Sequence, residues 1–378
     1  MAQERFAEYV ARGADGSARS RGAVAEPADL VTRWRQEMER TVQRAQHLTE
    51  MVLRPQEPRV GASPREEIHR TNKSRLYRYH SARTHRTPVL FVPNLGISRP
   101  YIFDLLPGGS FVEHMTAQGF DFYLLDWGVF GPEDNTLTLE HCVTRILPRM
   151  VDKVLQTSDR SELTLLGYCM GGTMTAAYLS WTAQPPVRNF IDMAGPIDFS
   201  KIGLFGRWLD QKYFDVNRFV DTLGAVPADA VRVGFKMLRP TMDVATNLNL
   251  WWNAWNAKYL EVFSALNHWA NDYVAFPGEF FRQWVRDYYQ ENRLMQGTLM
   301  LAGRPVRLAN IRCPLFAVGA QEDYIAPPES VRALIDAVSS RDKEYVELPG
   351  GHISLIAGRG AAVSCWPKVS GWLGRRSD

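Results

Sequence analysis

Long hydrophobic runs are missing from this sequence. No stretch of about eighteen consecutive apolar residues occurs, and a membrane-spanning helix needs that length. The first residues also lack the charged start and short apolar core of a secretory signal peptide. We therefore expect neither a membrane span nor secretion, and we predict a cytoplasmic protein.

Cysteine is scarce, and neither sign of charge predominates. The four cysteines show no paired metal-ligand spacing, and their usage suits a reducing compartment better than a disulfide framework: Cys142, Cys169, Cys313 and Cys365. We therefore expect no metal site. The formal net charge is only +3, which gives no general case for binding nucleic acid.

The rest of the composition is that of an ordinary globular protein. Apolar residues make up 45% and charged residues 22% of 378 positions, enough for one large α/β domain or two small ones. Buried-strand patterns occur at 87–93, 120–127, 162–168, 190–196, 313–319 and 345–351, after edge strands within 68–87. Helical patterns occur at 137–155, 172–181 and 329–338. This alternation predicts a mostly parallel sheet with helices on both faces.

The most informative stretch runs from Glu162 to Thr173. Apolar and β-forming residues lead into Gly167-x-Cys169-x-Gly171, the pattern of a sharp strand-to-helix turn that carries a nucleophile, with cysteine in place of the commoner serine. Small residues flank the nucleophile because its backbone is strained. The amides and dipole of the next helix point at the sulfur and favour an anion there. Cys169 is therefore the predicted nucleophile.

An acid and a histidine follow further along the chain. Asp323 comes after the predicted strand 313–319, and His352 ends the strand pattern that starts at residue 345. The order nucleophile, acid, histidine, each on a loop after a different parallel strand, is that of the α/β-hydrolase fold. We therefore predict a triad of Cys169, Asp323 and His352 in which the imidazole takes the thiol proton.

Two further details concern this triad. Glu322 is the adjacent rival of Asp323, and because successive strand residues face opposite ways, only one of the two can point at the histidine. The backbone amide of Met170 is the expected oxyanion donor, and an amide of Leu95 or a neighbour completes the pair. Asp126 ends the predicted strand 120–127 near the same edge of the sheet, where we expect a structural hydrogen-bonding role.

A set of motifs occurs in a fixed order along the chain. The motifs are Arg99-Pro-Tyr-Ile-Phe-Asp-Leu105, Asp126-Trp-Gly128, Gly-Tyr-Cys169-Met-Gly-Gly, Asp198-Phe199, Trp269-x-x-Asp272, Tyr289-x-x-Asn-x-Leu-x-x-Gly297, Gly-Ala-Gln-Glu-Asp323-Tyr-Ile-Ala-Pro-Pro and Gly-Gly-His352-Ile. Together they resemble the catalytic blocks of polyhydroxyalkanoate synthases from about residue 85 to the end. Tyr324 stands where that family often has histidine, and residues 93–98 differ from its usual proline-rich segment.

The resemblance implies an acyltransferase that polymerises (R)-3-hydroxyacyl-CoA, with 3-hydroxybutyryl-CoA as the expected substrate. Cys169 would take the acyl group, CoA would leave, and a hydroxyl group would attack the enzyme thioester. Asp323 would either support His352 or help to deprotonate that hydroxyl. The CoA thioester is a substrate, so no cofactor is implied.

The same resemblance implies partners. The chain length resembles the short two-component types, class III or IV, whose catalytic subunit works with a second synthase subunit. The growing polyester, the surface of a cytoplasmic polymer granule and a second copy in a homodimer are further candidate partners.

Two other functions stay open. A cysteine-dependent hydrolase, such as a dienelactone hydrolase or a thioesterase, also fits Gly-Tyr-Cys-x-Gly-Gly, although a compact lactone hydrolase needs no long cap and no extra N-terminal segment. A catalytically idle protein that coats granules is disfavoured by the intact order of the three triad residues.

The pattern also predicts how the chain is divided. Residues 1–29 form a small, polar and basic tail without fixed structure. Residues 30–66 form an N-terminal helical segment, with a helix from Pro27 to about Leu53, because apolar residues recur there at helical spacing: Leu30, Trp34, Met38, Val42 and Ala45. We expect this helix to pack on the main domain, with docking to a partner subunit or a granule as the alternative.

The α/β-hydrolase core comprises residues 67–200 and 308–378. Residues 201–307 show no buried-strand pattern and many aromatic residues, which predicts a helical cap inserted after the sixth strand. Most of these aromatic side chains should form the cap's own core. Such a cap would keep water from the nucleophile and offer a wall for an acyl chain.

Overall fold

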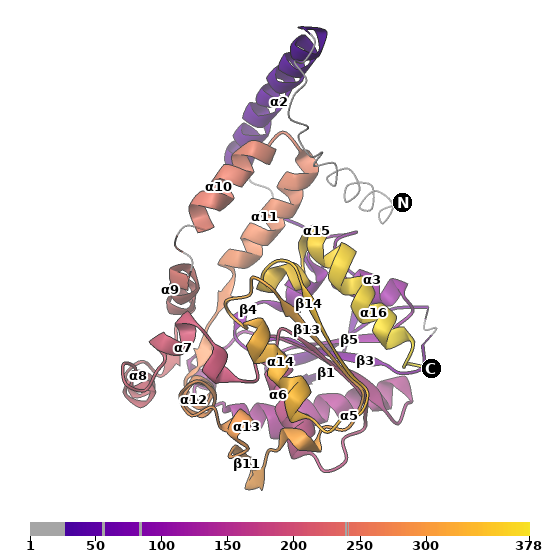
Figure 1. Ribbon diagram of the computed structural model, residues 1–378, viewed down its shortest axis with the longest axis vertical. Coiled ribbons are helices and arrows are strands. Elements are labelled where there is room, and N and C mark those ends of the chain that lie inside the picture. The colour runs from indigo at the N-terminus through magenta and orange to yellow at the C-terminus, as the bar shows by residue number, and fades with distance from the viewer. Residues whose placement is uncertain (1–26, 55–56, 83–84, 239, 241) are drawn as a thin grey trace.

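The structure is a computed structural model that describes residues 27–378 except 55–56, 83–84, 239 and 241 (Figure 1). The predicted tail therefore lies outside the described residues up to position 26. The main sheet has eight strands in the order β1-β2-β5-β3-β6-β7-β13-β14. These strands are β1 (Arg65–Thr71), β2 (Ser74–Tyr79), β3 (Val89–Val92), β5 (Phe122–Asp126), β6 (Leu163–Tyr168), β7 (Val187–Met193), β13 (Leu315–Ala320) and β14 (Lys343–Leu348).

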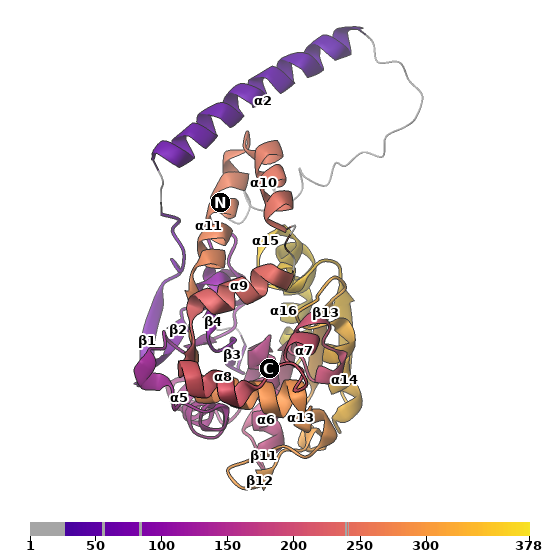
Figure 2. The same cartoon turned by 90° about the vertical axis from the view of Figure 1, so that its left-hand side faces the viewer.

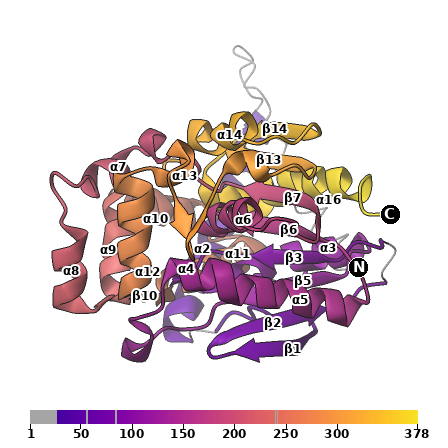
Figure 3. The same cartoon turned by 90° about the horizontal axis from the view of Figure 1, so that it is seen from below.

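The sheet is mostly parallel, as predicted. β5, β3, β6, β7, β13 and β14 run parallel to one another, whereas β2 pairs antiparallel with both β1 and β5. The parallel strands read as continuous apolar runs because both of their faces are covered. One face packs on α5 (Leu147–Ser158) and α6 (Met170–Trp181), which lie in front of the strands in Figure 3. The other face packs on α3 (Phe111–Ala117) and α16 (Trp366–Gly374).

The predicted helices are present with shifted bounds. The helix predicted at 329–338 is α14 (Pro328–Ala337), and α6 begins directly after Cys169. The helix predicted at 137–155 consists of α4 (Leu139–His141), a π-helical stretch (Cys142–Ile146) and α5. Pro148 lacks the amide that a regular α-helix needs there, which accounts for the π-helical stretch.

The chain between β7 and β13 is mostly helical. Its helices are α7 (Leu204–Trp208), α8 (Val216–Leu223), α9 (Ala228–Leu238), α10 (Met242–Asn253), α11 (Ala257–Asn271), α12 (Gly278–Gln283), a π-helical stretch (Trp284–Gln290) and α13 (Arg293–Gln296). The strands here have two residues each: β8 (Ala225–Val226), β9 (Tyr273–Val274), β10 (Phe276–Pro277), β11 (Met300–Leu301) and β12 (Arg304–Pro305). This segment follows β7, the sixth strand of the main sheet along the chain.

The aromatic residues of this segment differ widely in exposure. Phe280, Trp284 and Tyr288 are buried, as expected for an internal core. Trp251 and Trp252 on α10 expose 52% and 60% of their area. These two tryptophans are exceptions to the prediction that most of the aromatic side chains form the cap's own core.

One edge of the cap is tied to the loop that follows β3. The two-residue strand β4 (Ile97–Ser98) pairs antiparallel with β9. The Trp269 indole donates to the Arg99 carbonyl at 2.9 Å, and the Tyr101 hydroxyl donates to the Asp272 carboxylate at 3.0 Å. Two motifs that lie far apart in the sequence are therefore bonded to each other.

A second pair of motifs meets at Asn292. Its amide nitrogen donates to the Asp198 carboxylate at 2.8 Å, and its amide oxygen accepts from the Phe199 backbone at 3.1 Å. Asn292 has φ 45° and ψ 37°, a left-handed conformation that asparagine tolerates better than most residues. This side chain therefore joins the end of the cap to the loop after β7.

Replacing Asn292 with alanine should lower the free energy of unfolding by about 2–4 kcal/mol, because two hydrogen bonds are lost and alanine disfavours positive φ. The matched control is Asn292→Gly, which loses the same bonds without the penalty at φ. Urea unfolding should find the glycine variant about 1 kcal/mol more stable than the alanine variant. An alanine variant as stable as the wild type would contradict this role.

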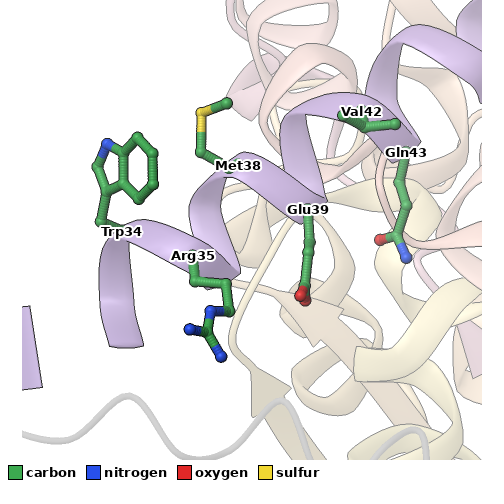
Figure 4. A pocket seen from close by; sticks show the side chains of 6 residues that line it. All are labelled: Trp34, Arg35, Met38, Glu39, Val42 and Gln43. Atoms are coloured by element: carbon green, nitrogen blue, oxygen red, sulfur yellow. The ribbon is translucent and has the colours of Figure 1, made fainter. Parts of the chain in front are cut away.

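The N-terminal helix α2 (Pro27–Leu53) extends away from the rest of the chain (Figures 1 and 2). The prediction of a helix is confirmed, but the prediction that its apolar stripe packs on the main domain is wrong. Trp34 is 67% exposed, and Met38 and Val42 are about half exposed along the same side of the helix (Figure 4). This part of α2 borders a hollow of about 430 Å³. Helical spacing predicts an apolar face but does not specify what covers it.

Contact between α2 and the cap occurs in the second half of the helix. The buried Arg44 donates to the Trp252 carbonyl at 3.4 Å, and His47 lies 2.7 Å from the Ala254 carbonyl. The Arg40 guanidinium lies 4.7 Å from the centre of the Trp255 ring. Within the part of the chain that the structure describes, no helix is long and apolar enough to cross a membrane.

Candidate active site

Cys169 lies at the sharp turn between β6 and α6. Its φ of 56° and ψ of −131° are strained for a residue with a side chain. The turn is held by hydrogen bonds on both sides, because the Cys169 amide donates to the Met193 carbonyl at 2.9 Å and the Gly172 amide donates to the Cys169 carbonyl at 2.9 Å. The structure therefore has the sharp turn that the sequence pattern predicts.

The glycines around Cys169 allow close approach of the backbone. A Cβ atom on Gly171 would lie 2.0 Å from the Val92 carbonyl oxygen, and one on Gly167 would lie 2.5 Å from the Cα atom of Gly172. The end of β3 and the first turn of α6 are therefore in direct backbone contact. This contact places the loop after β3 beside the nucleophile.

His352 and Asp323 form a short hydrogen bond. His352 Nδ1 lies 2.6 Å from Asp323 Oδ2, and both side chains are buried. Asp323 Oδ1 accepts hydrogen bonds from the amides of Ile325 and Ala326, each at 2.9 Å. Both carboxylate oxygens are therefore occupied, and the acid is fixed in one orientation.

The environment of His352 favours its protonated form. Burial alone would lower the pKa of this imidazole, but the negative charges of Asp323 and Cys169, together with side-chain hydrogen bonds to both, raise the pKa well above its usual value. The imidazole thus holds its proton between the carboxylate and the sulfur. The structure brings the three predicted side chains together, and their catalytic roles stay predictions.

The raised pKa of His352 leads to a prediction about stability. A histidine whose folded pKa exceeds its unfolded value of about 6.5 stabilises the fold fully below that pH, and the contribution disappears as the pH rises through the folded pKa. We expect the melting temperature of the wild type, relative to His352→Gln, to fall as the pH is raised above about 6.5. A difference that stays constant with pH would contradict the shift.

The burial of these two acids agrees with the choice of Asp323 over Glu322. Glu322 is exposed, whereas Asp323 is buried and contacts His352. Asp126 accepts a hydrogen bond from the Gly128 amide at 2.9 Å, which is the structural role that the sequence suggested.

The two predicted oxyanion donors lie on elements that touch Cys169. Met170 is the first residue of α6, where amide groups have no partner within the helix. Leu95 is buried in the loop after β3. That loop is fixed by the Trp127 indole, which donates to the Pro93 carbonyl at 3.0 Å, and by the Asn94 amide, which donates to the Gly96 carbonyl at 2.8 Å. The donor roles of Met170 and Leu95 stay predictions.

Two tyrosines near the triad were not singled out as site residues from the sequence. The Tyr168 hydroxyl donates to the His352 carbonyl at 3.2 Å, and the two rings lie 5.0 Å apart. Tyr289 belongs to the cap, and its pKa is raised by burial and by the nearby charge of Cys169. The only signals in the sequence were the position of Tyr168 next to Cys169 and the motif that begins at Tyr289. Tyr289 and Cys169 also pack against the same hydrophobic cluster.

Within the described residues, no group of three or more histidine, cysteine, aspartate or glutamate side chains is arranged to hold a metal ion. The predicted absence of a cofactor stays a prediction.

Comparison with known proteins decides the family. The family model described as the alpha/beta hydrolase fold matches residues 88–358. A poly(3-hydroxyalkanoate) polymerase subunit PhaC of Haloferax mediterranei is 36% identical over 354 residues, which cover 93% of this chain and 72% of that protein. A protein of the same name from Thiocystis violacea is 30% identical over 84% of this chain and 90% of its own length.

The chain belongs to the poly(3-hydroxyalkanoate) polymerase family. The resemblance stated from the motifs is thereby confirmed, and so are the α/β-hydrolase fold and the prediction of an enzyme of the acyltransferase class. A crystal structure of a lipase-like protein from Sulfolobus solfataricus has a TM-score of 0.52 at 14% identity, and it covers 82% of this chain and 93% of its own. That similarity supports the fold alone, and the polymerase family provides the functional context.

Proposed function

We propose that this chain polymerises (R)-3-hydroxyacyl-CoA, with 3-hydroxybutyryl-CoA as the substrate, and releases CoA through a thioester on Cys169. The observation that carries the proposal is the contact of His352 with both Asp323 and Cys169, in a chain of the polymerase family. A thiolate exchanges acyl groups with a thioester at little change in free energy, which suits cysteine to this substrate.

The residues divide the reaction into two acyl transfers. The proton of the Cys169 thiol resides on His352, whose raised pKa favours this state, and the thiolate sulfur attacks the carbonyl carbon of the CoA thioester. The bond to the CoA sulfur breaks, and CoA leaves with the proton from His352. The hydroxyl group of another unit then gives its proton to His352 while its oxygen attacks the enzyme thioester, which forms an ester and restores the thiol. The amides of Met170 and Leu95 stabilise the oxyanion in both steps.

The contacts of Asp323 favour a supporting role for this acid over direct deprotonation of the incoming hydroxyl group. One oxygen bonds His352 and the other accepts two backbone amides. Three hydrogen bonds therefore hold this carboxylate against His352 and the backbone of its own loop. We therefore assign to Asp323 the orientation of His352 and the stabilisation of its positive charge.

The cap supports transfer to a hydroxyl group over transfer to water. Tyr289 brings an aromatic ring near Cys169, and it lies in a segment with Trp284 and Tyr288, whose side chains are buried. An apolar surround disfavours bulk water at the thioester and accommodates an acyl chain. A polymerase needs this property, whereas a hydrolase does not.

A second synthase subunit is part of the proposal, together with the growing polyester and a cytoplasmic granule surface. The relatives are named as subunits, and the exposed stripe of Trp34, Met38 and Val42 on α2 provides an apolar surface for a partner. A homodimer is the alternative association. No cofactor is required, because CoA enters as part of the substrate.

The test measures CoA release from 3-hydroxybutyryl-CoA and the size of the product, with and without a co-expressed partner subunit. Release coupled to an insoluble polyester is expected, with higher specific activity when the partner is present. Release of free hydroxy acid alone would instead identify a thioesterase. Full polymerase activity without the partner would remove the requirement for a second subunit.

A further inference from the structure

Asp192 is a buried carboxyl group that the triad does not use. It lies in β7 and is 0% exposed, and among the residues that the structure describes no donor makes a hydrogen bond of ordinary geometry to either of its oxygen atoms. Burying a charge without a partner is strongly unfavourable, so an isolated carboxyl in such a place is expected to keep its proton. An ion pair therefore does not explain why the Asp192 carboxyl group is buried.

The side chain of Asp192 lies against two glycines. A Cβ atom on Gly172 would lie 1.9 Å from Asp192 Oδ1, and one on Gly195 would lie 2.1 Å from the same oxygen. Gly172 is the third residue of α6, and Gly195 lies in the loop after β7. The carboxyl group therefore contacts the backbone of both segments at the point where they also lie against each other, because a Cβ atom on Gly172 would lie only 3.0 Å from the Gly195 Cα atom.

The contact at Gly172 leads directly to Cys169. The Gly172 amide donates to the Cys169 carbonyl, and Gly172 packs against Gly167, which pairs in register with Asp192 between β6 and β7. Asp192 thus supports the first turn of α6 from the side of the sheet. A shift of this turn would move the sulfur relative to His352.

The neighbouring elements provide no cation. β6, β13 and α6 contain no lysine, arginine, histidine, aspartate or glutamate. Their ionisable groups other than Cys169 are Tyr168, which packs on the opposite face of the sheet, and Tyr178, whose pKa is raised by burial and by Asp152. Burial raises the pKa of Asp192 well above its usual value, and the Gly195 amide opposes this effect more weakly.

The charge of Asp192 also matters for the nucleophile. An anion beside the first turn of α6 would interact with the same helix dipole that stabilises negative charge at Cys169, and it would repel that charge. An uncharged carboxyl group provides the shape and the contacts without this repulsion.

We propose that Asp192 is a positioning residue for Cys169, an uncharged carboxyl group that holds the first turn of α6 against β7. The inference rests on the proposed function only in taking Cys169 as the nucleophile. It requires two properties, the shape of the side chain and the absence of charge, and each can be measured without the polymerase reaction.

Shape is tested by the rate at which iodoacetamide alkylates Cys169, followed by mass spectrometry of the peptide. We expect Asp192→Ala to change the rate at least about tenfold, because small displacements of reacting groups have large effects on rate. The isosteric Asp192→Asn should restore the rate to within about threefold of wild type. Alkylation of the half-buried Cys313 in the same digest is the internal control, and its rate should not change. An alanine variant that reacts like the wild type, or an asparagine variant that reacts like alanine, would overturn the positioning role.

Charge is tested by the pH dependence of unfolding in wild type and Asp192→Asn, and this measurement does not need the alanine variant to fold. An aspartate with a raised folded pKa keeps its proton in the folded state and loses it above about pH 3.9 in the unfolded state. The wild type should therefore lose stability relative to Asp192→Asn as the pH rises. Above about pH 4, the ratio of their unfolding constants should change by up to about tenfold for each pH unit, for as long as the folded carboxyl keeps its proton. His352 is present in both proteins, so its titration cancels in the ratio. A ratio independent of pH would show that Asp192 is charged and would overturn the proposal.

The two tests separate this inference from the proposed function. Wild-type protein that makes no polymer, but gives the expected alkylation and pH results, would remove the function and leave the role of Asp192 intact. Polymer synthesis by the wild type, together with an unchanged alkylation rate in Asp192→Ala, would support the function and remove the role of Asp192.

Discussion

Replacement of Cys169 by alanine is expected to lower CoA release by at least about 10³-fold, because loss of a covalent nucleophile removes the pathway through an enzyme thioester. The turn that carries Cys169 does not depend on the sulfur, since its hydrogen bonds are made by the backbone of residues 169, 172 and 193. The variant should therefore fold and melt close to the wild type. Rates are measured as CoA release with 3-hydroxybutyryl-CoA as the substrate. Folding is measured by thermal melting.

The matched control for this experiment is Cys313→Ala. Cys313 is also a free and half-buried cysteine, but it lies before β13 and outside the triad. It should retain at least about half of the wild-type rate, as expected for a change away from the reacting atoms. A Cys169→Ala protein with a tenth or more of wild-type activity would rule out the covalent mechanism.

The second large effect is expected at His352. His352→Gln keeps a polar side chain but cannot exchange a proton near neutral pH, and CoA release should fall by about 10²–10⁴-fold. Asp323→Asn should cause a loss of similar order, because an amide can donate to His352 Nδ1 and favour the wrong tautomer of the ring. The double variant should be little worse than either single variant, since residues that act as a unit are not additive.

Glu322→Gln is the control for the acid. It removes an adjacent carboxylate that is exposed and is expected to change the rate by less than about twofold. Activity that depends on Glu322 and not on Asp323 would show that the acid had been assigned to the wrong residue. Loss of activity in Glu322→Gln alone would therefore be decisive.

The features that the sequence predicted well are those encoded within a short segment. The apolar run that ends in Gly167-x-Cys169-x-Gly171 specifies a strand, a turn and a helix together, and the structure has all three. Asp323 and His352 each follow a strand pattern, and parallel strands bring their loops to one edge of the sheet. Their proximity therefore follows from the fold class, even though their roles still need measurement.

The features that could not be predicted depend on contacts between distant segments. The stripe on α2 has the spacing of a buried face, yet Trp34 is largely exposed, because periodicity does not encode the presence of a neighbour. Asp192 reads as one polar residue within a strand, and only the positions of Gly172 and Gly195 reveal what it touches. Tyr289 is one of many aromatic residues in its segment until the structure places it near Cys169.

The pairing of β4 with β9 has a consequence for exchanging parts between polymerases. The loop that contains Leu95 receives hydrogen bonds and packing from residues 269–276, so the two segments form one structural unit although they are far apart in the chain. A chimera that takes the cap of another polymerase but keeps this loop would combine halves of a unit that did not evolve together. A chimera should therefore keep residues 269–277 with the loop that contains Leu95. Both segments should come from the same polymerase.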